Sequence, residues 1–175
     1  MLPQFAVVGG WKLSGSKEWG VHSKQSLRLW LRLLRTTATI EKAVRSHLRD
    51  QFATTLPRFD VLSALDRADD KLTMSELSER LLVSNGNVTG VVARLLEDGL
   101  VGREVDSGDR RVQRVFLTET GRRTFREMAK EHERLIEHIM DPASAEEVDQ
   151  MLRQTGRLLE IARAQLARPT AGKVR

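Results

Sequence analysis

The sequence of 175 residues contains no cysteine, which excludes disulfide bonds, thiolate metal ligands and a switch based on thiol oxidation. It also lacks any apolar run close to the roughly 20 residues that a membrane-spanning helix requires. Residues 1–20 show no continuous apolar segment before a small-residue cleavage site, so a secretory signal is not expected. These absences favour a cytoplasmic protein without a membrane partner.

A strong charge of one sign is also missing. The formal net charge is +5, from 29 Lys and Arg against 24 Asp and Glu. Residues 1–50 carry nine basic and three acidic residues, whereas residues 71–122 carry eight of each. Bulk charge is therefore a weak indicator of nucleic-acid binding here, and motif geometry has to supply the evidence for it.

The spacing of apolar residues predicts a mainly α-helical chain with one β-hairpin. The expected helices cover about residues 24–51, 57–65, 73–82, 85–97, 118–140 and 144–166, and the expected strands cover 100–105 and 112–117. Capping boxes are expected at Thr73 with Glu76 and at Ser144 with Glu147, and Thr118 is expected to cap a further helix. The turn residues at 106–109 would close the hairpin.

This order divides the chain into five parts. They are an N-terminal arm, expected to be flexible, at 1–22; an N-terminal dimerisation helix region at 23–56; a winged helix-turn-helix domain at 57–121; C-terminal dimerisation helices at 122–168; and a tail at 169–175. The outer helices carry more apolar surface than the central domain can cover, so we expect two chains to pair. A monomer whose long helices fold back on themselves is the alternative.

Two short helices followed at once by a hairpin are typical of the winged helix-turn-helix, which inserts its second helix into the major groove of DNA. The exposed side of that helix is small and polar, and asparagine and arginine can read adenine and guanine edges. At the hairpin tip, the Asp109 carboxylate can hydrogen-bond to the Arg111 guanidinium and so orient it for the minor groove of DNA. The candidate DNA contacts are Ser84, Asn85, Asn87, Val88, Thr89, Arg94, Asp109, Arg110 and Arg111. Each feature alone also fits a solvated helix face or a surface turn.

Residues 73–81, 88–95 and 109–121 resemble the MarR family. The most specific motif is Asp-x-Arg followed by Val-x-Leu-Thr-x-x-Gly, formed by Asp109, Arg111, Val115, Leu117, Thr118 and Gly121. The resemblance covers about residues 25–166. It implies an obligate homodimer that binds a pseudo-palindromic double-stranded DNA operator, usually as a repressor released by a small molecule. It also implies that Arg111 is the wing arginine and that Asp109 orients it.

A basic stripe on the first long helix indicates an anionic effector. Its residues, Arg28, Arg35, Lys42 and Arg49, recur every seven positions, nearly two helical turns. A solvated face is the simpler interpretation. Residues 30–35, 55–60 and 84–90 are similar to MarR-type regulators of hydroxycinnamate degradation, which implies an aromatic acyl-CoA effector. The candidate effector-binding residues are Trp30, Arg35, His47 and Arg58, although Trp30 also fits a simple core position.

Other functions are less well supported by the sequence. We find no Gly-rich phosphate loop and no nucleophile elbow, so neither an enzyme nor a cofactor is expected. A metal site is not expected either, because His132 and His138 are six residues apart and do not share a helix face. The alternatives are a MarR-type regulator of efflux or stress genes with a different phenolic ligand, and a winged-helix module that binds only proteins.

Overall fold

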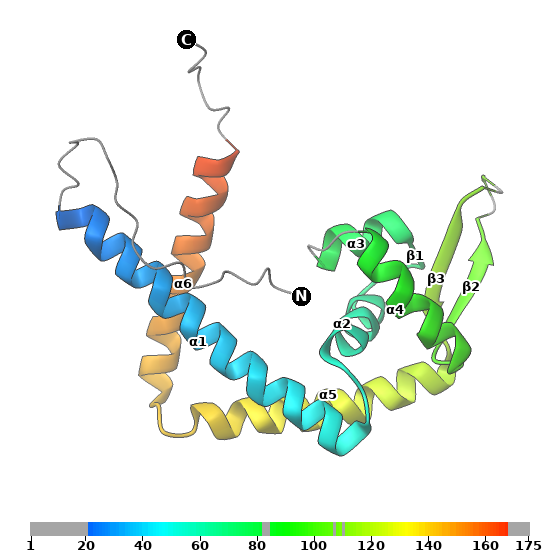
Figure 1. Ribbon diagram of the computed structural model, residues 1–175, viewed down its shortest axis with the longest axis horizontal. Coiled ribbons are helices and arrows are strands. Elements are labelled where there is room, and N and C mark those ends of the chain that lie inside the picture. The colour runs from blue at the N-terminus through cyan, green and yellow to red at the C-terminus, as the bar shows by residue number, and fades with distance from the viewer. Residues whose placement is uncertain (1–20, 82–84, 107, 110, 168–175) are drawn as a thin grey trace, which may run out of the picture. The chain divides into compact units, whose positions relative to one another are not determined.

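The computed structural model describes residues 21–81, 85–106, 108–109 and 111–167 (Figure 1). The chain forms two compact units, Met1–Lys42 and Ala43–Arg175. Most of the predicted arm and the whole predicted tail lie outside the described residues. None of the described helices combines the length and the hydropathy that a membrane span requires.

The elements follow the expected order, with one addition. They are α1 (Val21–Phe52), α2 (Leu56–Asp66), β1 (Leu72–Thr73), α3 (Met74–Leu81), α4 (Asn85–Glu97), β2 (Val101–Val105), β3 (Gln113–Leu117), α5 (Glu119–Met140) and α6 (Ala145–Leu166). The first unit contains the N-terminal part of α1, and the second contains the rest of α1 and all later elements. The predicted fold class, mainly helical with a small β wing, is confirmed.

Local signals set the helix ends where the sequence predicts them. The Thr73 hydroxyl accepts the Glu76 N–H at 3.2 Å, and the Glu76 carboxylate accepts the Thr73 N–H at 2.7 Å. Ser144 and Glu147 make the same reciprocal pair at the start of α6. Just after α4, Gly99 adopts a φ of +67°, a left-handed conformation that glycine takes without a Cβ clash.

Strand β1 was not predicted. It pairs antiparallel with β3, so that the sheet has the order β1-β3-β2, with Leu72 opposite Val115 and Thr73 opposite Arg114. A two-residue strand is too short to show an alternating pattern in the sequence. The hairpin of β2 and β3 is in register from Val101 opposite Leu117 to Val105 opposite Gln113.

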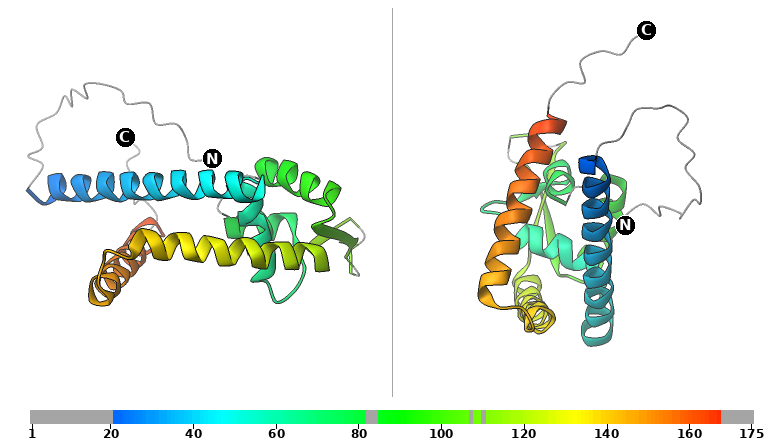
Figure 2. Two further views of the ribbon diagram at one scale, coloured as in Figure 1. Left: turned by 90° about the horizontal axis from the view of Figure 1, so that it is seen from below. Right: turned by 90° about the vertical axis from the view of Figure 1, so that its left-hand side faces the viewer.

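One core holds the helix-turn-helix and the hairpin together in the second unit. Its buried apolar residues are Val44, Leu48, Phe59, Val61, Leu62, Leu65, Leu72, Leu77, Val88, Val92, Leu95, Val101, Val115, Leu117, Phe125 and Met128. They come from α1 to α5 and from all three strands. In Figures 1 and 2, α2, α3, α4 and the sheet gather around one end of α5, and α6 follows the other end. Because α4 and the hairpin both contribute side chains to this close-packed core, their relative position is fixed.

Candidate nucleic-acid interface

Helix α4 has one buried side and one open side. Val88, Val92 and Leu95 are at most 3% exposed and anchor the helix in the core. The exposed residues of α4 that the structure describes are small or polar, namely Gly86, Asn87, Thr89, Gly90, Ala93, Arg94 and Glu97. The open side of α4 can therefore approach a partner closely, because the exposed residues described on its first two turns carry no large side chain.

The structure corrects one of the predicted DNA contacts. Val88 is only 1% exposed, so its side chain belongs to the core and not to the open side of α4. Its spacing of four and seven residues from Val92 and Leu95 is that of an apolar helix face, and this pattern decides its position. Asn87, Thr89 and Arg94 lie on the exposed surface as expected. Ser84, Arg110 and the side chain of Asn85 lie outside the described residues.

At the hairpin tip, Asp109 holds Arg111 in a two-pronged ion pair. The Arg111 Nε donates to Asp109 Oδ1 at 3.1 Å, and Nη2 donates to Oδ2 at 3.0 Å. The hydrogen bonds from the Arg111 side chain are the larger cause, and the one from the Arg111 backbone N–H the smaller cause, of a lowered pKa of the Asp109 carboxyl. The Arg111 side chain is nonetheless 91% exposed. The guanidinium is thus oriented before any partner binds and remains accessible to one.

A second carboxylate, which the sequence analysis did not place in the site, organises the tip backbone. Asp106 accepts the N–H groups of Gly108 at 2.8 Å and Asp109 at 3.1 Å, and it forms an ion pair with Arg114. The Arg114 hydrogen bond, then the two N–H groups, lower the pKa of Asp106 from 3.8 to about 2. The turn residues at 106–109 predict the end of a hairpin. They do not indicate that Asp106 pairs with Arg114, which lies eight positions further along the chain.

The lowered pKa of Asp106 makes its stabilising effect dependent on pH. Because the folded state favours the ionised carboxyl, this contribution is complete above about pH 5 and is lost as the pH falls through about 4 toward 2. Urea unfolding of the wild type and Asp106→Asn should therefore show a stability difference at pH 7 that shrinks between pH 4 and 2. Asp149→Asn, an exposed carboxylate on α6, is the control. A difference that stays constant down to pH 2 would refute this role of Asp106.

The base of the hairpin is tied to the start of α5 through the Leu-Thr-x-x-Gly motif. The Thr118 hydroxyl donates to the Gly99 carbonyl at 2.8 Å and accepts the Gly121 N–H at 2.9 Å. The Leu100 carbonyl accepts the Thr118 N–H at 3.1 Å. A Cβ atom on Gly121 would lie 1.8 Å from the Leu100 carbonyl oxygen, which leaves room only for glycine. The motif thus fixes the end of α4, the hairpin and α5 at one point.

The candidate effector residues are divided between the two units. Trp30 and Arg35 are exposed in the first unit, and Trp30, at 58% exposure, does not occupy a core position within one chain. His47 and Arg58 are partly buried in the second unit. Arg58 forms an ion pair with Asp98, just after α4, so at least part of its guanidinium has a structural role.

His132 serves as a packing residue of α5. Its ring lies against Phe59, with 5.0 Å between the ring centroids, and burial together with nearby His47 lowers its pKa. Within the described part of the chain, no group of three or more His, Cys, Asp or Glu side chains could hold a metal ion.

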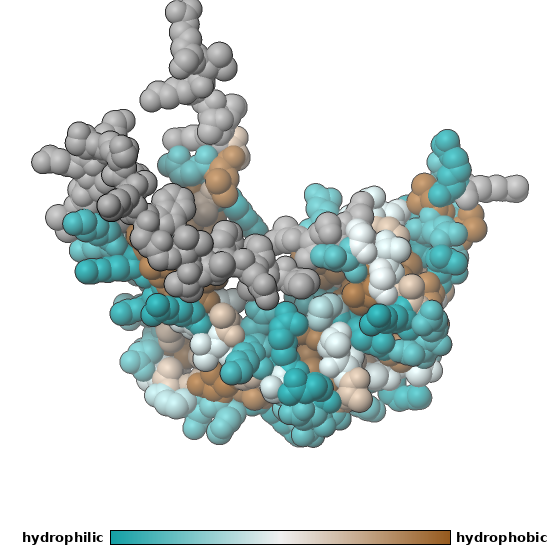
Figure 3. Space-filling model, in the orientation of Figure 1, coloured by the Kyte–Doolittle hydropathy of each residue, from teal (hydrophilic) through white to brown (hydrophobic). Residues whose placement is uncertain are grey.

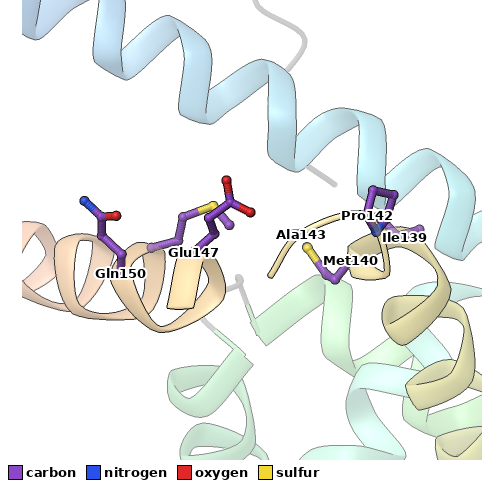
Figure 4. A pocket seen from close by; sticks show the side chains of 7 residues that line it. Ile139, Met140, Pro142, Ala143, Glu147 and Gln150 are labelled. Carbon is purple, nitrogen blue, oxygen red and sulfur yellow. The ribbon is translucent and has the colours of Figure 1, made fainter. Parts of the chain in front are cut away.

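A hollow of about 410 Å³ lies at the corner between α5 and α6 (Figure 4). It is lined by Ile139, Met140, Pro142, Ala143, Glu147, Gln150 and Met151. None of the four candidate effector residues lines this hollow. It is therefore a separate feature of the α5–α6 corner.

Comparisons with known proteins agree with this geometry. A MarR family profile matches residues 54–112. The HTH-type transcriptional regulator YsmB of Bacillus subtilis is 30% identical over 115 residues, which are 66% of this chain and 78% of YsmB.

Solved structures show the same fold. The crystal structure of a MarR family transcriptional regulator from Silicibacter pomeroyi has 30% identity and a TM-score of 0.67 over 83% of this chain and 98% of its own. Streptococcus pneumoniae FabT, crystallised in complex with DNA, has a TM-score of 0.66 at 23% identity over 80% of this chain and 99% of its own. The expectation of a regulator instead of an enzyme is confirmed, and the chain belongs to the MarR family of DNA-binding transcriptional regulators.

Proposed function

We propose that this protein is a homodimer that binds a pseudo-palindromic DNA operator and represses transcription from it. The observation that carries the proposal is the open polar side of α4 beside a hairpin tip on which Asp109 presents an exposed arginine. Both features belong to one unit with a shared core, so they can engage one duplex together.

In this proposal α4 reads bases in the major groove. Asn87 lies on the exposed surface, where its amide can donate to and accept from an adenine edge. Arg94, about two turns further along, can bind a guanine edge or a phosphate. Gly90 has no heavy atom within 4 Å of its missing Cβ, so the helix backbone can approach the groove floor there.

The hairpin supplies a second contact in the minor groove. A guanidinium at the tip fits the narrow groove of A·T-rich DNA, whose negative potential is concentrated. Asp109 restricts the Arg111 side chain before binding, which lowers the entropic cost of inserting it.

Exposed apolar helices support the homodimer. The structure describes all of α6 and buries none of its residues. Its exposed large apolar residues are Met151, Leu152, Leu159, Ile161 and Leu166, and those of α1 are Leu27, Leu29, Trp30 and Leu31. Figure 3 shows part of this hydrophobic surface at the C-terminal end of α6. A partner chain would remove such surface from water, and two-fold pairing would place the two α4 helices one DNA turn, about 34 Å, apart.

The test is selection of duplexes from a random pool by the full chain. We expect a two-fold-symmetric site whose affinity falls steeply with salt, by about 0.9 in log K per neutralised phosphate for each decade of salt concentration. A winged-helix module that binds only proteins would enrich no sequence, and this result would contradict the proposal.

We further propose that an anionic aromatic effector, such as an aromatic acyl-CoA, releases the operator of a hydroxycinnamate catabolic operon. Four basic residues of α1, Arg28, Arg35, Lys42 and Arg49, are exposed and suit phosphate groups. Among the described residues, three buried nitrogen atoms have no hydrogen-bond partner, namely His47 Nε2, Arg58 Nε and His132 Nδ1. Two of them belong to candidate effector residues, and a ligand that supplied their partners would fit this proposal.

Adding p-coumaroyl-CoA or feruloyl-CoA to the protein–operator complex tests this effector. Release of DNA by the thioesters, with free CoA as the inactive control, is the expected result. Release by a free phenolic compound alone would favour the alternative, a regulator of efflux or stress genes. If millimolar thioester neither binds nor releases DNA, the acyl-CoA proposal is wrong.

A further inference from the structure

Arg114, on β3, connects three separate parts of the second unit. Its Nη1 donates to the Lys71 carbonyl at 2.9 Å and lies 3.7 Å from the Glu76 carboxylate. Its Nε donates to Asp106 in an ion pair. One guanidinium, 30% exposed, thus joins the segment before β1, the first turn of α3 and the hairpin tip.

On the hairpin side, the contacts continue to the wing arginine. Asp106 accepts the backbone N–H groups of Gly108 and Asp109, and Asp109 in turn holds the Arg111 guanidinium. Every link in this series is a charge-assisted hydrogen bond, and such bonds are shorter and stronger than neutral ones.

On the helix side, the contacts reach the start of the helix-turn-helix. Glu76 accepts the Thr73 N–H in the capping box of α3, and Thr73 pairs with Arg114 across β1 and β3. The carboxylate that caps α3 therefore also faces the guanidinium that holds the tip. Lys71 adds a second tie between these segments, because its Nζ pairs with Glu104 on β2.

We infer that Arg114 is a positioning residue, which fixes the direction of the hairpin tip, and so of Arg111, relative to the helix-turn-helix. A hairpin of five-residue strands is held along its length by its own backbone pairing, but none of the tip residues that the structure describes is buried in the core. A tip already held in place binds DNA at a smaller entropic cost than a mobile one. This inference rests on the proposed DNA binding only for its functional consequence.

A double-mutant cycle with Arg111 tests the functional consequence. On the selected duplex with A·T-rich flanks, Arg114→Gln should raise the Kd about tenfold in the wild-type background. In the Arg111→Ala background the same substitution should change the Kd by about twofold or less, because the group that it positions is already gone. Arg114→Lys, which keeps the charge and one contact, should recover part of the affinity.

The matched control is Arg103→Gln, an exposed arginine on β2 of the same hairpin. It removes the same charge but none of the three Arg114 contacts, so its effect should be small and equal in both backgrounds. Equal losses for Arg114→Gln in both backgrounds would mean that Arg114 contacts DNA itself or only stabilises the fold, and would overturn the inference.

Hydrogen exchange tests the positioning without DNA. The amide protons of Gly108, Asp109 and Arg111 should exchange about tenfold faster in Arg114→Gln than in wild type or Arg103→Gln. Unchanged exchange would refute the inference even if DNA binding were lost. Failure of the wild type to select any duplex would refute the proposed function alone. If Arg114→Gln does not fold, Arg114→Lys provides the same comparison with a smaller change.

Discussion

Replacing Gly121 by alanine is expected to destabilise the second unit by at least about 3 kcal/mol, because the new methyl group would overlap the backbone of the preceding segment. The Cβ atom would lie 1.8 Å from the Leu100 carbonyl oxygen and 2.8 Å from its carbon. Both are main-chain atoms, so no side-chain rotation can relieve the clash. The first turn of α5 would have to separate from the hairpin base, which also breaks the Thr118 hydrogen bonds.

Gly90→Ala is the matched control, since Gly90 lies within α4 and has no heavy atom within 4 Å of its missing Cβ. The same chemical change should raise stability there by about 0.5–1 kcal/mol, because alanine favours the helix. Urea unfolding followed by circular dichroism measures both effects. If the two variants were equally stable, the close approach of the Leu100 backbone would not explain why residue 121 is a glycine.

Removing the two proposed reading groups is expected to weaken operator binding in different ways. Asn87→Ala should cost about 1–3 kcal/mol at particular base pairs, and the preference at those positions should relax. Arg111→Ala should weaken binding most on duplexes with A·T-rich flanks, where the minor groove is narrow. Binding titrations on the selected duplex and on versions with altered flanks separate the two effects.

Arg153→Ala supplies the control for this pair. It removes an exposed charge from α6, away from α4 and the hairpin, and should bind the operator like the wild type. Both reading variants fold without loss of a buried side chain, because Asn87 and Arg111 are exposed. If both bound the operator as the wild type does, the assignment of the reading residues would be wrong.

The fold could be predicted to the extent that it is encoded by neighbouring residues. The two capping boxes and the Thr118 cap each join groups three residues apart, and the structure confirms all three caps. Strand β1 could not be predicted, because its two residues join the sheet only through β3, which is some 40 residues away. Pairing between distant segments leaves no periodic pattern in so short a strand.

In the candidate site too, contacts between sequence neighbours could be predicted and contacts between distant positions could not. The Asp109–Arg111 pair could be predicted, since the two residues are separated by one position and share a turn. The contacts of Arg114 with Lys71 and of Arg58 with Asp98 span 43 and 40 positions, and charge patterning cannot pair residues at such separations. The prediction that Val88 contacts DNA is wrong, because its apolar spacing with Val92 and Leu95 places it in the core.

The central claim is that two copies of α4 lie in successive major grooves of one duplex. Sedimentation of the protein alone and on its selected duplex tests this claim most directly. We expect twice the mass of one chain for the protein alone, and the mass of two chains plus one duplex for the complex, because each of two half-sites about 10 base pairs apart would hold one α4. A single chain in solution that binds every duplex equally well, or none, would contradict it.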